Sequence, residues 1–179
     1  MLQHQEVEQK LTLYNMNNLS NDLKKEAIGL GLCEQWTSEW GNPNKDELVD
    51  KYVRGIDFCI EHDYPTVECI KANFSGVMEG HGVFADNILN LLNRSIAIIN
   101  GECEGVINYD GYNTGRIYIR HKSDIHIITK GNSKVFISIY DDSKVTIECS
   151  DNAKVYVYKY GGSVVFTGNV IVRNKDLHK

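Results

Sequence analysis

The stretch GNSKVFISIYDDSKVTIECSDNAKVYVYKY, residues 131–160, contains one ten-residue pattern three times. In each ten, the first three residues are drawn from Gly, Asn, Asp, Ser and Ala. Lys-Val follows, and apolar residues then occupy every second position. Alternation of this kind predicts a short β-strand, and Gly, Asn, Asp and Ser favour turns. The repeat therefore predicts a series of short strands that tight corners join in one register.

The same columns extend over seven lines when the chain is written in tens from Gly101. The third column holds mostly small residues, and the fifth and seventh columns hold mostly Val and Ile. We expect these odd columns to point into a core and the even columns to point outward, because side chains alternate across a strand. The clearest inward residues are Val135, Ile137, Val145, Ile147, Val155 and Val157.

The number of residues in one coil follows from the distance between packed sheets. Two sheets pack about 10 Å apart, so a coil of one ten could not enclose two facing rows of Val and Ile. We expect two tens per coil and a parallel β-solenoid with two sides. An antiparallel meander, with DDS, DNA and GGS as hairpin loops, is the alternative. A meander does not require the same residue type in the same column, so the repeat favours the solenoid.

The lines GNSKV, DDSKV and DNAKV resemble the Asn-Ser-Lys-Val repeats of short-repeat β-solenoid proteins of bacteria and their phages. The resemblance covers residues 101–170 approximately and is one of repeat style. It implies a bacterial or phage origin and a role in interaction or assembly.

The first part of the chain has a helical period instead. Asn44 with Glu47 forms a capping-box pattern before an apolar stripe, and Thr66 is a second N-cap candidate. The stripe contains Leu48, Tyr52, Ile56, Cys59 and Ile60. The sequence thus predicts an α+β protein with a helical docking or oligomerisation region over 1–82 and a β-solenoid repeat domain over 83–179. We expect the helical region to cap the first coil, to contact a second copy, or both.

Composition narrows the class of protein. The chain has 179 residues, 42% of them hydrophobic, with a net charge of −5 and a mean hydropathy of −0.33. No apolar run approaches the ~20 residues of a membrane span, and the first residues lack the basic and apolar segments of a secretion signal. The five cysteines form no CxxC pair, which indicates reduced, mostly buried thiols. We expect a protein of the cytoplasm, the host's if a phage encodes it.

No motif for catalysis, metal binding or cofactor binding occurs in the chain. The paired acids Asp141 and Asp142, and Asp151, fall in turn columns, where a turn role accounts for them. We therefore expect a non-enzymatic protein without cofactor or metal. A carbohydrate-active β-helix is a weaker alternative, because such enzymes use carboxylate pairs but are usually far longer.

One outward face of the expected solenoid combines aromatic and basic residues. If alternate tens share a side, the lines from 111, 131 and 151 place the following residues together: Arg116, Arg120, Lys134, Phe136, Lys154, Tyr156 and Tyr160. Residues 91–179 hold 12 basic and 9 acidic residues, whereas residues 1–90 hold 7 and 15. An excess of this size, +3, is too small for a dedicated binder of duplex DNA.

These features predict an interaction or assembly module whose rigid solenoid presents this binding face to a protein partner or to a second copy. A protein that binds a small anion, a nucleotide or an oligonucleotide is the alternative, because aromatic rings among cations suit stacking on bases. Exposed strands also favour Tyr, Phe and Thr for structural reasons alone, so a solvated sheet face remains a further interpretation.

Overall fold

The computed structural model describes the backbone of residues 2–176, and the side chains of residue 15 and residues 17–176. The chain divides into two compact units, Met1–Val77 and Met78–Lys179. The first unit is helical. Its helices are α1 (Leu2–Gly29), α2 (Glu34–Ser38), α3 (Lys45–Arg54), α4 (Ile56–Glu61) and α5 (Val67–Phe74). Of the helices described, none is long and apolar enough to cross a membrane.

Both predicted caps of the helical unit are present. The Asn44 side chain accepts from the Glu47 amide, and the Glu47 carboxylate accepts from the Asn44 amide, which completes the capping box of α3. Thr66 caps α5 by accepting from the Cys69 amide. The apolar stripe that follows Asn44 was expected to form one helix, but Gly55 ends α3 before α4 begins. Glycine has the weakest helix propensity after proline, so a break at this position has a local cause.

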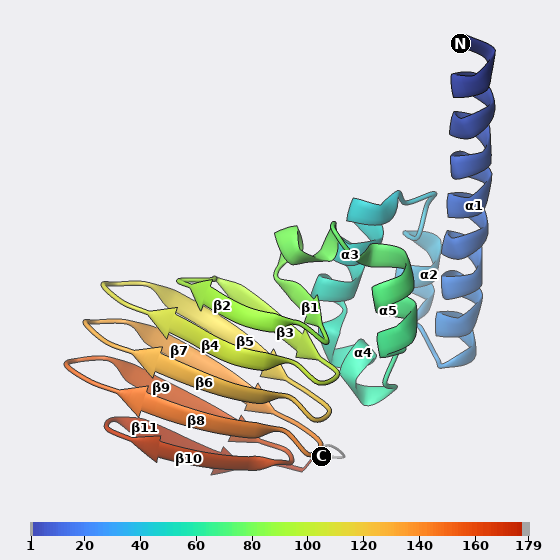
Figure 1. The fold of residues 1–179 in the computed structure, drawn as a ribbon. Coiled ribbons are helices and arrows are strands. Elements are labelled where there is room, and N and C mark those ends of the chain that lie inside the picture. The colour runs from blue at the N-terminus through green and yellow to red at the C-terminus, as the bar shows by residue number, and fades with distance from the viewer. Residues whose placement is uncertain (1, 177–179) are drawn as a thin grey trace. The chain divides into compact units, whose positions relative to one another are not determined.

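The second unit is the predicted two-sided parallel β-solenoid, and the antiparallel meander is excluded. After a 3₁₀ helix at Met78–His81 come β1 (Val83–Ala85), β2 (Ile88–Leu92), β3 (Ile96–Asn100), β4 (Glu104–Tyr109), β5 (Thr114–Ile119), β6 (Asp124–Thr129), β7 (Lys134–Ile139), β8 (Lys144–Cys149), β9 (Lys154–Lys159), β10 (Ser163–Thr167) and β11 (Val170–Asn174). Odd strands form one sheet, sheet A, and even strands form the other, sheet B. Every described pairing is parallel, and Figure 1 shows the strands stacked in two layers.

A full coil contains two tens, as expected. Lys134 pairs with Lys154 in sheet A, and Asp124 pairs with Lys144 in sheet B, so equivalent residues lie twenty positions apart. The inward columns form one apolar core between the sheets. All six Val and Ile residues that the repeat marked as inward belong to this core, with exposed fractions between 0% and 2%. The period of the sequence therefore determines both the length of the coil and the face that is buried.

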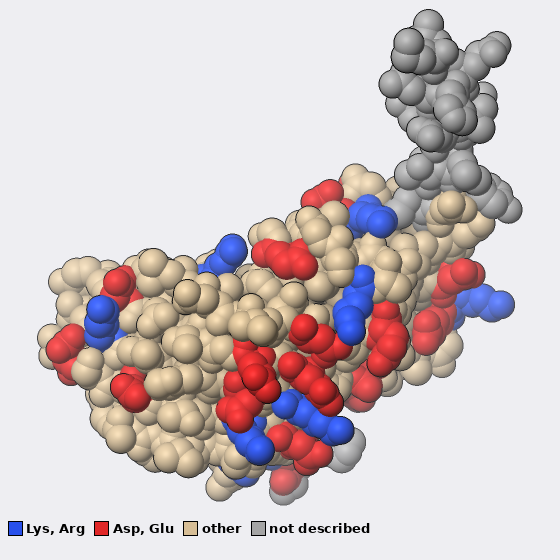
Figure 2. Space-filling model, in the orientation of Figure 1, with Lys and Arg blue, Asp and Glu red and all other residues tan. Residues whose placement is uncertain are grey.

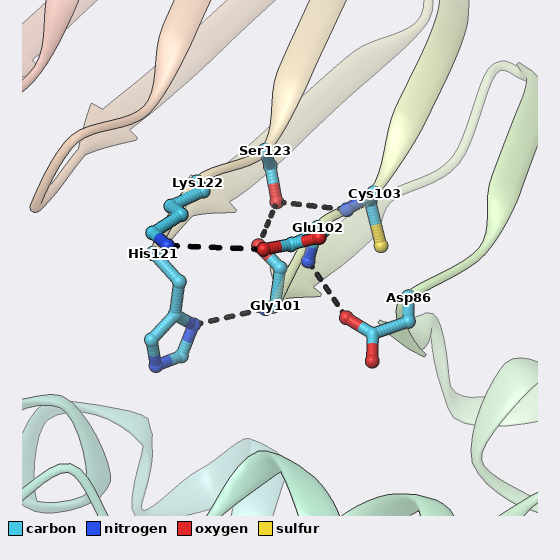
Figure 3. A network of polar contacts seen from close by, with 7 residues as sticks. All are labelled: Asp86, Gly101, Glu102, Cys103, His121, Lys122 and Ser123. Carbon is cyan, nitrogen blue, oxygen red and sulfur yellow. Dashed lines mark hydrogen bonds and ion pairs between the residues drawn. The ribbon is translucent and has the colours of Figure 1, made fainter.

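The corners explain why turn-forming residues recur every ten positions. Several corners place a residue in the left-handed region, where Gly, Asp and Asn are favoured, as at Gly101, His121 and Asp141 with φ of 75°, 61° and 53°. Corner side chains also accept hydrogen bonds from the backbone of an adjacent coil (Figure 3). His121 Nδ1 accepts from the Gly101 amide at 2.9 Å, and Asp86 Oδ1 accepts from the Glu102 amide at 2.7 Å. Corner side chains thus satisfy backbone amides that the strands leave unpaired.

The last coil departs from the strict repeat. The tens placed Val165 inward and Phe166 outward, but Val164 pairs with Val145 and Phe166 pairs with Ile147, so the strand is shifted by one residue. The cause lies in the corner, where Gly162 has φ 62° and approaches the Ser143 carbonyl so closely that a Cβ would overlap it. The glycine shortens this corner by one residue. At this end of the solenoid Val165 and Phe166 are 69% and 43% exposed.

The polar, charged tail RNKDLHK, residues 173–179, has the composition that we would expect of a cap on this end. Its first residues, Arg173 and Asn174, belong to β11 instead, and Lys175 and Asp176 are exposed. Residues 177–179, which complete the tail, lie outside the described residues.

Candidate binding face on sheet A

The two sheets differ in charge. The strands of sheet A contain Arg116, Lys134, Lys154, Lys159 and Arg173 and no Asp or Glu. The strands of sheet B contain Glu104, Asp124 and Glu148 and one lysine, Lys144. Sheet B faces the viewer in Figure 2, where charged atoms of both signs lie toward the ends of its strands and the middle is uncharged. The outer face of sheet A is therefore the basic side of the solenoid.

Outward residues of sheet A form columns that run along the solenoid. One column is Arg116, Phe136, Tyr156 and Ile171, each in register with the next. A second is Tyr118, Ser138, Tyr158 and Arg173. Lys134 and Lys154 are neighbours in a third. Because adjacent strands lie about 4.8 Å apart, side chains within a column are in contact range.

The aromatic rings on this face stack on one another. The Phe136 and Tyr156 rings have centroids 5.2 Å apart and planes 14° apart. Tyr140 and Tyr160 stack at 4.7 Å and 9°. These separations match the spacing of the coils, so the backbone register is the cause of the stacking.

The cations of the face have no anionic partner within the described chain. Arg116, Lys134, Lys154 and Arg173 form no ion pair with any carboxylate that the structure describes. Lys134 Nζ lies 6.0 Å from the Tyr156 ring centroid, at the outer limit of a cation–π contact. On sheet B, in contrast, His126 Nε2 lies 3.0 Å from Glu148 Oε1. The positive charge of the sheet A face is thus not neutralised by neighbouring side chains.

Of the seven residues that the sequence assigned to the binding face, five lie at least partly exposed on strands of sheet A, and Tyr160, also partly exposed, directly follows β9. The seventh, Arg120, is only 2% exposed and donates from Nη1 to Asn100 Oδ1 at 3.3 Å. Tyr118 and Tyr140, also on outward positions, are 7% and 5% exposed. Alternation along a strand predicts which way a side chain leaves the sheet, but it does not predict whether that part of the sheet is covered. Arg120 therefore belongs to a buried polar pair.

The sequence assignment missed three residues of the face: Tyr158, which is partly exposed on β9, and Ile171 and Arg173 on β11. Ile171 is 44% exposed and pairs with Tyr156, and Arg173 is exposed and pairs with Tyr158. The repeat of ten did not predict these two positions, because the last coil on this side contains fifteen residues instead of twenty. Val155 therefore pairs with Val170 and not with residue 175. The alternation in VIVRN was the available signal for an additional strand. We define the basic face as Arg116, Lys134, Phe136, Lys154, Tyr156, Tyr158, Ile171 and Arg173.

Thiols and other potential metal ligands form no cluster in the part of the chain that the structure describes. Among the described residues, no three His, Cys, Asp or Glu side chains lie together as a metal site would require. All five cysteines are free thiols, and Cys59, Cys103 and Cys149 are buried. Burial raises the pKa of the Cys103 thiol, which therefore stays protonated and donates to the Asn100 carbonyl at 3.2 Å.

The described fold and face define the class of this protein: a helical unit joined to a two-sided parallel β-solenoid with one basic, aromatic side. The chain matches no protein-family model, no curated protein and no solved structure.

Proposed function

We propose that this protein is a non-enzymatic interaction module that binds an anionic partner on the basic face. The observation that carries the proposal is the segregation of charge between the sheets. Four exposed cations share one face on which no strand contributes a carboxylate. A ligand that brings negative charge would supply the missing counterpart, and complementary charge of this kind promotes encounter and specificity.

The pairing of Lys134 with Lys154 supports this proposal. Like charges directly opposite each other in a sheet destabilise it, by about 0.2–1 kcal/mol on the scale of cross-strand pairs. The equivalent position in sheet B pairs Asp124 with Lys144, so the repeat accommodates opposite charges at this column. Two lysines in register cost stability and strengthen the attraction for an anion. A role in binding accounts for that cost.

The solenoid also suits binding because it is ordered before a ligand arrives. The columns of the basic face are held by parallel strands whose inward residues are almost fully buried. Stacked rings have little rotational freedom left to lose on binding. Preorganised side chains reduce the entropic cost of association.

Heparin, a dense polyanion, is a suitable first probe for the full chain. The variant Arg116→Gln, Lys134→Gln, Lys154→Gln removes three charges from the basic face. The matched control Lys122→Gln, Lys130→Gln, Lys144→Gln removes three charges from exposed lysines outside it. Fluorescence anisotropy with labelled heparin measures the affinity of each.

We expect the basic-face variant to lose about tenfold or more in affinity, which corresponds to at least about 1.4 kcal/mol, and the control to change little. Binding by the unaltered protein should weaken as salt is added, since salt screens exposed charges. Equal losses in the two triple variants would mean that only net charge matters and would refute the proposed face.

A further inference from the structure

We infer that the partner of the basic face is an acidic segment of a protein that also carries apolar residues, contacted through cationic groups, tyrosine hydroxyls and ring edges. This inference rests on the proposed function, that the basic face binds an anionic partner. It selects between the two partner classes that the sequence left open, a protein and a nucleic acid.

The first reason is that Phe136 and Tyr156 close one face of each other and lie between two further side chains of their column. Phe136 and Tyr156 turn one face toward each other at 5.2 Å. Arg116 is the next residue of the column beyond Phe136, and Ile171 is the next residue beyond Tyr156. Binding of single-stranded nucleic acid depends on aromatic faces that are open to bases. This column has a neighbour on both sides of each ring.

The second reason is that the column cannot open to admit a base. A base between two rings would need a separation of roughly 6.8 Å, twice the 3.4 Å rise per base of a DNA strand. The two stacked pairs lie at 5.2 Å and 4.7 Å. Their spacing is set by the coils, whose strands are joined by backbone hydrogen bonds at about 4.8 Å. Widening it would break the sheet.

The third reason is the chemistry that the stacked column leaves for a ligand. With the faces that they turn toward each other closed, Phe136 and Tyr156 offer their edges, and the edge of an aromatic ring carries the positive end of its quadrupole. Tyr156 and Tyr158, both partly exposed, add hydroxyl donors. A carboxylate accepts hydrogen bonds and donates none, so it is complementary to this set of groups.

The fourth reason is that apolar and cationic groups are mixed on the face. Phe136 and Ile171 lie in the same column as Arg116. A nucleic acid held by its phosphates alone would use the cations and leave the apolar groups without a counterpart. A peptide in which acidic and apolar residues alternate can use both kinds of group, and aromatic residues and arginine are common anchors of protein interfaces.

Two probes of matched length test the inference with the full chain: a labelled peptide of alternating glutamate and leucine, and labelled oligo(dT). The first variant is Lys154→Glu, which turns the like-charge pair with Lys134 into an opposite-charge pair. We expect it to raise the melting temperature slightly and to weaken peptide binding about tenfold or more. A loss of binding in a more stable protein cannot result from unfolding. The control Lys144→Glu lies at the same column of sheet B and should leave peptide binding unchanged.

The second variant combines Tyr156→Phe with Tyr158→Phe. It keeps both rings, so stacking on bases would be unaffected, but it removes two hydroxyl donors. We expect weaker peptide binding in this variant, and tighter binding of the peptide than of oligo(dT) by the unaltered protein at equal salt.

The outcomes separate the inference from the function on which it rests. Tighter binding of oligo(dT), lost in Lys154→Glu and unchanged in the phenylalanine variant, would overturn the inference and leave an anion-binding face in place. If Lys154→Glu affected neither probe, the proposed function itself would be wrong.

Discussion

Tyr109 and Gly115 form a packing pair whose energetics can be measured. Tyr109 is fully buried and its hydroxyl donates to the Arg94 carbonyl at 2.6 Å. A Cβ at Gly115 would overlap the hydroxyl and ring carbons of Tyr109. In the following coils the equivalent pairs are Thr129 with Val135 and Cys149 with Val155. The glycine thus interrupts a valine column because the tyrosine ring fills that space.

A double-mutant cycle should therefore show strong coupling. Gly115→Val alone forces a side chain into occupied space, and overpacking of this kind costs about 3 kcal/mol or more. Tyr109→Thr alone leaves a cavity where a ring was and costs about 3–5 kcal/mol. The double variant recreates the Thr129 and Val135 arrangement, so we expect it to lie within about 1.5 kcal/mol of the unaltered protein. The coupling energy would then be at least about 3 kcal/mol in favour of the double variant.

Urea unfolding measures these free energies. Far-UV circular dichroism follows the helices and the solenoid together. Both tryptophans, Trp36 and Trp40, belong to the helical unit, so their fluorescence follows that unit separately. The two probes need separate analysis, because a chain with two units need not unfold in one step. Additive losses in the double variant would refute the view that the ring occupies the place of a valine.

Two further outcomes follow from single residues. Burial raises the pKa of Tyr109 from 10.0 to about 12. The unfolded chain therefore releases this proton at a lower pH than the folded chain does. The stability that results is present below pH 10 and is lost as the pH rises toward 12. In urea titrations above pH 10, the free energy of unfolding of Tyr109→Phe should fall less steeply with pH than that of the unaltered protein. At neutral pH this variant should lose about 1 kcal/mol, because the hydrogen bond to Arg94 is gone. An unchanged slope above pH 10 would contradict this assignment. At the corner, Asp151 has φ 56° and its Oδ2 accepts from the Gly131 amide at 2.8 Å. Melting temperatures should fall in the order Asp151→Asn, Asp151→Gly, Asp151→Ala, since glycine loses only the bond and alanine adds about 1–2 kcal/mol of left-handed strain; an alanine variant as stable as the glycine variant would disprove the role of strain.

The candidate site was only partly predictable from the sequence. The alternation of side chains along each strand and the length of twenty residues per coil were sufficient to place four residues together on one side: Lys134, Phe136, Lys154 and Tyr156. The stacking of Phe136 on Tyr156 is a consequence of their register in adjacent coils, and it changes which part of each ring a ligand can reach. Burial of Arg120 depends on coverage of the sheet, which no local pattern encodes.

The sequence by itself determined the parallel solenoid, the twenty-residue coil and the inward columns, because a repeat of ten with alternating apolar residues has a fixed direction for each side chain. Local capping patterns likewise determined where α3 and α5 begin. The tertiary structure alone decided the one-residue shift of β10, since Gly162 shortens its corner by approaching the Ser143 carbonyl from the coil before. It also decided that Gly115 must lack a side chain, because the Tyr109 ring that fills the space comes from the facing sheet. The length of the repeat and the alternation of side chains can be read from neighbouring residues. Close approach between coils and between sheets depends on residues that are distant in sequence.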